Sequence, residues 1–313
     1  MNNGVLLAFL SYSAFALSDA SVKLLEGTLD PFQVAFTGAL LGLAVLPFIR
    51  RPEDRYGDVF ATSRRDLWLL RAGAAMVGTV CSVIAFTTLP MPEAFVLIFL
   101  MPLFVTILSV LFLKEQVGPW RWTAVVLGFL GVLVVLRPGF RDLHGGHLAA
   151  FACGLASAAS VVALRHARVS DKPISLFGSG LVGSLVGNGI LMLPGLVLPD
   201  GRQIIFLLGY GLLAALGQML LILAAQRAPA SQIAPPQYSQ MVWAVALSYL
   251  LFDQPVDVAT FIGIAIIIGA GLLTWARERI RFTRMGTMWR GPFRAGGYSR
   301  PPAASPPPSY PES

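Results

Sequence analysis

The 313-residue chain is 56% hydrophobic and only 12% charged, with a mean hydropathy of +0.71 and a formal net charge of +7. A soluble domain carries about 25% charged residues, so this composition excludes an ordinary water-soluble globular protein. The apolar runs are continuous, which also excludes an outer-membrane barrel, because barrel strands alternate apolar and polar residues over about 10 positions. The composition is typical of a helical protein that crosses a membrane several times.

Ten apolar runs are long enough to form membrane-spanning helices, which need about 20 residues each. Turn-forming pairs such as Asp30-Pro31 and Gly118-Pro119 separate them. No basic region precedes the first run, so we expect it to be retained as a span and not cleaved as a signal peptide. In chain order the expected spans are 4–24, 32–49, 67–89, 91–112, 119–136, 147–164, 174–198, 204–226, 230–252 and 256–276.

The basic residues predict how these spans are oriented. With the N-terminus in the cytoplasm, most of the 23 lysine and arginine residues fall in inner loops or after the last span. Cytoplasmic loops are enriched in these residues, so we expect a multi-pass protein of the inner membrane with both termini in the cytoplasm. The same bias accounts for the net charge without a nucleic-acid partner.

The end of the chain differs from the rest in composition. Residues 277–313 are rich in arginine and then in proline and serine. Such a segment cannot bury enough apolar surface to offset its ordering entropy. It is therefore predicted to be a disordered cytoplasmic tail.

The two halves of the chain resemble each other. When Gly4 is aligned with Gly146, Ala8-Phe9 meets Ala150-Phe151. Each half then contains five spans, and an odd number of spans turns the second half upside down relative to the first. Inverted repeats are a structural basis for alternating access, with the solute site at the repeat interface. We expect a first repeat at 1–139 and a second, inverted repeat at 140–276.

Several stretches carry a family resemblance: Leu89-Pro-Met-Pro-Glu-Ala-Phe, Met101-Pro-Leu-Phe-Val, Leu113-Lys-Glu-Gln and Gly128-Phe-Leu-Gly-Val-Leu. Together they resemble the EamA-type repeat of the drug/metabolite transporter superfamily. Residues 228–276 are similar to a weaker copy, with Met241 in place of Pro102 and Gln254 in place of Glu115. The fold that the resemblance implies is an all-α membrane protein of ten transmembrane helices, arranged as two inverted five-helix repeats.

The resemblance also implies a function. It indicates a secondary transporter that moves a small-molecule substrate through the lipid bilayer, driven by protons or by exchange. The family's solutes include amino acids, amines, vitamins and adenosyl compounds. Two alternatives stay open, namely a translocase for lipids or lipid-linked sugars, and a membrane scaffold or sensor that does not transport. Nothing in the sequence sets the oligomeric state.

The ninth span is polar for a helix that faces lipid. Gln237, Tyr238, Gln240 and Trp243 lie within it. An amide in hydrocarbon is costly unless it is paired, so these side chains face either a cavity or a neighbouring helix. We interpret them as substrate-binding candidates, with hydrogen bonding between helices as the alternative.

Prolines and other polar residues add to the candidate site. Pro102 lies within the fourth span, and Pro235 and Pro236 lie early in the ninth, its counterpart in the second half. Paired helix breaks in two repeats point to a binding site, although a packing kink is the alternative. Tyr12 and Phe15 in the first span, and Asn188 and Gln218 in spans seven and eight, are further substrate-binding candidates.

Two carboxylates are candidates for coupling transport to protons. Asp19 falls within the first span, where an ionisable group is a functional candidate by default. Its alternative role is a structural pair with Lys23, one helical turn away. Glu93 follows Pro92 at the start of the fourth span, where the helix dipole alone would favour an acid.

Motifs for other chemistry are absent from the sequence. It contains no GxxxxGK[ST] phosphate loop, no HExxH and no GxSxG. Its three histidines form no metal-ligand cluster with Cys81 and Cys153. We therefore expect neither an enzyme nor a bound cofactor or metal.

Overall fold

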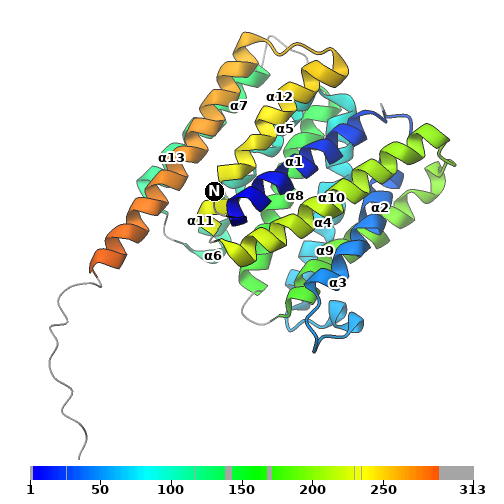
Figure 1. The fold of residues 1–313 in the computed structure, drawn as a ribbon, viewed down its shortest axis with the longest axis horizontal. Helices are drawn as coiled ribbons and strands as arrows, with labels where there is room; N and C mark the ends of the chain where they lie inside the picture. Colours follow the sequence, from blue (N-terminus) through cyan, green and yellow to red (C-terminus); the bar gives the residue numbers. More distant parts are fainter. Residues whose placement is uncertain are drawn as a thin grey trace, which may run out of the picture.

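The computed structural model describes residues 3–25, 27–115, 117–137, 143–167, 171–228, 230–233 and 235–288. Throughout these ranges the regular secondary structure is helical, and the helices pack as one bundle (Figure 1).

The first half of the chain begins with a long helix and a capped second helix. Asp30 accepts hydrogen bonds from the backbone N–H groups of Phe32 and Gln33, and Pro31 occupies the first helical position. Both features favour a helix start at this point. The elements are α1 (Asn3–Lys23), α2 (Pro31–Gly42), η1 (Leu43–Val45), α3 (Leu46–Ile49), η2 (Tyr56–Phe60), α4 (Arg65–Thr88), α5 (Met91–Ile98), α6 (Met101–Leu113) and α7 (Pro119–Leu136).

The second half follows a similar course and contains the longest helices. Asp200 and Gln203 form a capping box, in which each side chain accepts the other residue's backbone N–H at the start of α10. The elements are α8 (Gly145–Ala167), α9 (Pro173–Leu191), η3 (Leu193–Gly195), α10 (Gly201–Arg227), α11 (Ala230–Ile233), η4 (Pro235–Tyr238), α12 (Ser239–Phe252) and α13 (Val258–Met288).

Within the described residues, seven helical segments are long and apolar enough to cross a membrane. The apolar stretches Trp122–Leu136 of α7 and Val258–Leu273 of α13 are shorter than these seven segments. This confirms the expected all-helical chain with several membrane-length helices. The seven segments are Asn3–Lys23, Pro31–Ile49, Arg65–Thr88, Met91–Leu113, Gly145–Leu164, Pro173–Leu191 and Gly201–Arg227.

Two expected boundaries were wrong. The span expected at 174–198 ends as a helix at Leu191, because Pro194 falls in a separate short turn, η3. The tail expected to be disordered from residue 277 is helical as far as Met288. Arginine, glutamate and methionine are good helix formers, so the helix of the last span continues. The remainder of that expected tail, 289–313, lies outside the described residues.

The ninth expected span, 230–252, is broken into three elements. A single turn, α11, is followed by the short 3₁₀ turn η4, which contains Pro235 and Pro236, and then by α12. Proline lacks the N–H that a continuous helix would use. The break expected in this span is therefore present in the backbone.

The helices pack in pairs drawn from the two halves. The most extensive pairs are α1 with α10, α4 with α8, and α7 with α13, and the last pair lies at one edge of the bundle (Figure 1). Small residues allow close approach, because Gly131 of α7 and Gly263 of α13 each face the other's backbone carbonyl. Between α1 and α10, the hydroxyl of Ser11 donates to the carbonyl of Gly217 at 2.7 Å.

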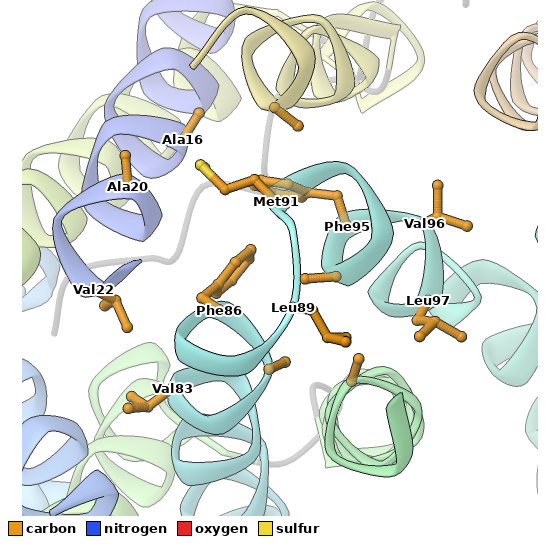
Figure 2. Packing of buried hydrophobic residues seen from close by; sticks show 14 of the residues in the cluster. Ala16, Ala20, Val22, Val83, Phe86, Leu89, Met91, Phe95, Val96 and Leu97 are labelled. Carbon is orange, nitrogen blue, oxygen red and sulfur yellow. The ribbon is translucent and has the colours of Figure 1, made fainter. Parts of the chain in front are cut away.

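The main apolar core lies where α1, the end of α4, and α5 meet. Figure 2 labels buried side chains from these three helices, together with Leu89 in the connection between α4 and α5. The rings of Phe86 and Phe95 meet edge to face, with their centroids 5.0 Å apart. This core supports one wall of the candidate site described below.

Gly183 provides a test of the packing between α4 and α9. A Cβ atom at Gly183 would overlap the backbone of Ala72 on α4, whereas one at Gly73 would meet no atom within 4 Å. We expect Gly183→Ala to lower the free energy of unfolding by about 1–3 kcal/mol, as overpacking does. The control, Gly73→Ala, should be neutral or stabilising, since alanine favours a helix. Thermal unfolding of the detergent-solubilised proteins measures both, and equal melting temperatures would contradict this packing.

Candidate functional site

A cavity of about 130 Å³ joins elements from both halves of the chain. We call it the aromatic cavity. Four residues singled out from the sequence meet here, namely Asp19, Pro102, Gln237 and Gln240. The complete lining is Asp19, Ser82, Phe86, Phe95, Ile98, Phe99, Met101, Pro102, Gln237 and Gln240.

Two helix breaks form much of this lining. In the first half, α5 ends at Ile98 and α6 begins at Met101, with Pro102 in its first turn, where a missing N–H costs no helical hydrogen bond. In the second half, η4 gives way to α12 at Ser239. The first turns of α6 and α12 therefore both reach the cavity, through Met101, Pro102 and Gln240.

The far ends of α6 and α12 are built alike. Lys114 after α6 and Asp253 after α12 adopt left-handed conformations, with φ of 52° and 49°. In each case the next residue's N–H returns to a serine carbonyl in the last turn: Glu115 N to Ser109 O at 3.3 Å, and Gln254 N to Ser248 O at 3.0 Å. Such bonds satisfy carbonyls that a helix end would leave unpaired.

Asp19 does not form the ion pair with Lys23 that the sequence allowed. The Lys23 ammonium instead donates to the carbonyl of Leu89 at 2.7 Å and lies 5.2 Å from the centroid of the Phe252 ring. Among the described residues, no side chain forms a hydrogen bond or an ion pair with the Asp19 carboxylate. Its carboxylate therefore lines the cavity without a neutralising partner there.

Aromatic rings make up the apolar wall of the cavity. Ring centroids lie 5.0 Å apart between Phe86 and Phe95, 6.3 Å between Phe95 and Phe99, and 6.0 Å between Phe99 and Tyr238. Tyr238, a predicted site residue, thus extends this wall from the second half. The three phenylalanines were not predicted from the sequence, although Phe95 and Phe99 stand one helical turn apart directly before the break at Pro102.

Other predicted residues lie apart from the aromatic cavity. The Trp243 indole donates to the Ser13 hydroxyl at 2.9 Å and so links α12 to α1. Asn188 is fully buried and donates to Thr79 of α4 at 2.9 Å. The rings of Tyr12 and Phe15 pack against each other on α1, with centroids 6.3 Å apart. Three further candidates lie outside the cavity lining: Gln218 on α10, and Pro235 and Pro236 in η4.

Glu93 lines a second cavity, of about 320 Å³, which we call the acidic cavity. Its Oε2 lies 3.7 Å from Nε2 of His147 on α8. At the same cavity, Asp257 pairs with Arg137. The two carboxylates predicted to couple protons, Asp19 and Glu93, therefore lie in different cavities. The acidic cavity is lined by Pro90, Pro92, Glu93, Ser248, Asp253, Gln254, Pro255, Val256, Asp257 and Thr260.

Outside the apolar helices, the connection before α4 is tied to the connection before α9. Lys172 contacts Asp58 at 2.6 Å and Asp54 at 3.1 Å, and Asp171 accepts a hydrogen bond from Thr62 at 2.6 Å. The hydrogen bond from Lys172 lowers the pKa of Asp58 below its usual value, and the same bond raises the pKa of Lys172. These contacts hold residues 50–64 against the start of α9.

These two shifts predict when the contact stabilises the connection. The ionised Asp58 carboxylate stabilises the folded connection fully above its unfolded-state pKa of about 3.9. This stabilisation is lost as the pH falls through its lower folded-state pKa. The charged Lys172 ammonium stabilises the folded connection fully below its unfolded-state pKa of about 10.4. This stabilisation is lost as the pH rises through its higher folded-state pKa. We expect Lys172→Met to speed hydrogen exchange in residues 54–63 at about pH 7 and to have a smaller effect at about pH 3, where Asp58 has begun to lose its contribution. Equal effects at both pH values would contradict the contact.

The chain was compared with protein families and with solved structures. The EamA-like transporter family model matches residues 2–137 and again residues 144–276. A solved structure titled "Crystal structure of protein" aligns with a TM-score of 0.59 at 19% identity, covering 89% of this chain and 97% of that one. This likeness concerns the fold alone.

Three relatives illustrate the proteins that this chain is similar to. The S-adenosylmethionine uptake transporter of Rickettsia prowazekii is 28% identical, with 88% of this chain and 94% of the relative covered. The riboflavin transporter of Vibrio cholerae is 26% identical, with coverage of 79% and 83%. The pseudopaline exporter of Pseudomonas aeruginosa is 24% identical, with coverage of 86% and 95%. Because the family model covers nearly all of the chain up to residue 276, the chain belongs to the EamA-like transporter family.

Proposed function

We propose that the chain is a secondary transporter that carries a small metabolite across the inner membrane by alternating access, with the aromatic cavity as its solute site. One observation carries this proposal: a carboxylate, two amides and three aromatic rings line one cavity between broken helices of both halves. Sites of this composition orient small solutes by a few polar groups within an apolar pocket. Broken helices within a membrane bundle commonly supply such sites.

The packing of the helices supports an inverted repeat of five spans in each half. Span one of the first half, α1, packs on span three of the second, α10, and the converse pair, α4 and α8, also packs. Likewise α12 packs on α1, and α6 packs on α8. A pseudo-two-fold axis relating the halves would produce this exchange of partners. The matching ends of α6 and α12, and the two matches to the family model, support the same arrangement.

The size of the cavity supports a conformational step. Ligand sites usually measure about 300–1,000 Å³, and the aromatic cavity has about 130 Å³. A solute of nucleoside size therefore requires the surrounding helices to move apart. We propose that the breaks beside Pro102 and at Pro235 and Pro236 act as the hinges of this movement.

The lining supports a heterocyclic or amine-bearing solute. Glutamine both donates and accepts hydrogen bonds, and aromatic rings stack on heterocycles and attract cations. We propose an amino acid, amine, vitamin or adenosyl compound as the solute class. Glu93 beside His147, together with Asp19, stays our candidate for proton coupling, and the bias of basic residues supports cytoplasmic termini.

Counterflow in proteoliposomes tests this function. Vesicles holding the purified full chain are loaded with one unlabelled solute, and entry of the same labelled solute is followed. S-adenosylmethionine, riboflavin, amino acids and amines are tested in turn. We expect transient, saturable accumulation of one of them, absent from protein-free vesicles. If folded protein exchanges none of these solutes, the proposed transport of small metabolites is wrong, and lipid-linked solutes become the next assay.

A further inference from the structure

The aromatic cavity joins structural features of opposite electrostatic sign. Its lining includes the Asp19 carboxylate of α1. The same lining includes the first turns of α6, which has 13 residues, and α12, which has 14. The N-terminus of a helix carries a partial positive charge of roughly half a unit, and its first N–H groups lack helical partners. The lining therefore offers a favourable contact to a cationic group, at Asp19, and to an anionic group, at the two helix starts.

Gln240 is an independent sign of a ligand at the helix starts. The residue is only 9% exposed and lines the cavity from the first turn of α12. Among the described residues, its amide forms no hydrogen bond with another side chain or with the backbone. The Gln240 amide is not among the fully buried unpaired side-chain atoms in the described part of the chain, so it keeps accessible surface through which it can bond to a solute. A carboxylate in the cavity would accept a hydrogen bond from it, alongside the helix N-termini.

The Asp19 carboxylate and the aromatic wall of the cavity suit a positive charge. No lysine or arginine is among the described residues that line the cavity, and Lys23 is bound to Leu89. The rings of Phe86, Phe95 and Phe99 stand in a row along the wall. Phenyl faces attract cations, and more strongly where water is excluded.

We propose that the aromatic cavity binds a zwitterion. Its cationic centre, an ammonium or sulfonium group, lies between Asp19 and the phenylalanine rings. Its carboxylate lies against the first turns of α6 and α12 and accepts a hydrogen bond from Gln240. This inference rests on the proposed transport function and specifies the charge pattern of its solute.

Two matched sets of probes test the charge pattern by counterflow. One set is S-adenosylmethionine, its decarboxylated form and 5′-methylthioadenosine, which retains the adenosyl group without either charge. The other is tryptophan, tryptamine and indole-3-propionate. We expect the zwitterion of one set to exchange at least about 10-fold faster than its partners. Equal or faster exchange by riboflavin or by a probe lacking one charge overturns the zwitterion while leaving transport established. Absence of exchange by every probe overturns the transport function itself.

Two variants assign the charges to residues. In each variant, unlabelled probes compete with the labelled solute for counterflow. Asp19→Asn should weaken the inhibition by the exchanged zwitterion, and by its analogue that carries only the positive charge, by about 10- to 100-fold. Gln240→Leu should weaken the inhibition by the zwitterion and leave the inhibition by the cation-only analogue unchanged. A purely structural role would weaken every probe equally, and that result would overturn the assignment. Asp66→Asn is the matched control, since Asp66 pairs with exposed Arg64 outside the cavity. Thermal unfolding confirms that each variant is folded.

Discussion

Gln240→Leu should reduce the initial rate of counterflow at least about 10-fold, with the protein still folded and inserted. Leucine nearly preserves the volume of glutamine but removes its donors and its acceptor. Because Gln240 is 9% exposed and lines the aromatic cavity, the solute loses a partner that water cannot replace. The rate is measured with the solute that wild-type protein exchanges.

The control for this result is Gln226→Leu. Gln226 is exposed on α10 and is absent from the lining of the aromatic cavity. The Gln226→Leu substitution makes the same chemical change as Gln240→Leu, so any general effect of that change on expression or insertion should appear in both variants. Wild-type rates for Gln240→Leu, at equal protein per vesicle, would exclude Gln240 from the solute site.

The sequence allowed part of this site to be predicted, because polar residues in apolar runs stand out. Asp19, Gln237 and Gln240 each need a partner or a cavity when surrounded by hydrocarbon, and all three line one cavity. The same reasoning selected Asn188, whose amide instead donates to Thr79 between α9 and α4. The pattern identifies a polar requirement, but the packing of neighbouring helices determines what satisfies it.

The aromatic wall could not be predicted in the same way. Phenylalanine is equally suited to lipid, to a core and to a cavity, so Phe86 carries no distinguishing signal in the sequence. The one-turn spacing of Phe95 and Phe99 before Pro102 does not by itself separate a cavity from a core. Their placement depends on where α5 ends and how α4 packs beside it. Such contacts are long-range and are determined by the fold.

The fold itself was more predictable than its boundaries. Long apolar runs must satisfy their backbone groups within one segment, so helices follow directly from composition. Residues after 276 are rich in arginine and then in proline and serine, and this composition predicts a disordered tail directly after the last span. Helix propensity acts whether the solvent is lipid or water, so α13 continues to Met288.

Cross-linking α1 to α12 should stop transport completely. Trp243 of α12 donates to Ser13 of α1. Under the proposed inverted repeat, the position in α6 that matches Trp243 is Phe104, which packs on Phe151 of α8 at 5.0 Å between centroids. In an inverted repeat these two interfaces exchange states, so one opens as the other closes. A link between α1 and α12 would hold one interface closed and so prevent the cavity from opening on that side.

The experiment places cysteines at Ser13 and Trp243 in a chain whose native Cys81 and Cys153 are replaced by serine. A short bis-methanethiosulfonate reagent forms the link, and dithiothreitol releases it. We expect counterflow to fall to the level of protein-free vesicles and to recover on reduction. Each single-cysteine variant treated alike controls for modification. The pair at Ser21 and Gly209, which joins α1 to α10 where those helices already touch, controls for cross-linking itself. Full transport by the linked Ser13–Trp243 protein would show that α1 and α12 need not separate during the cycle.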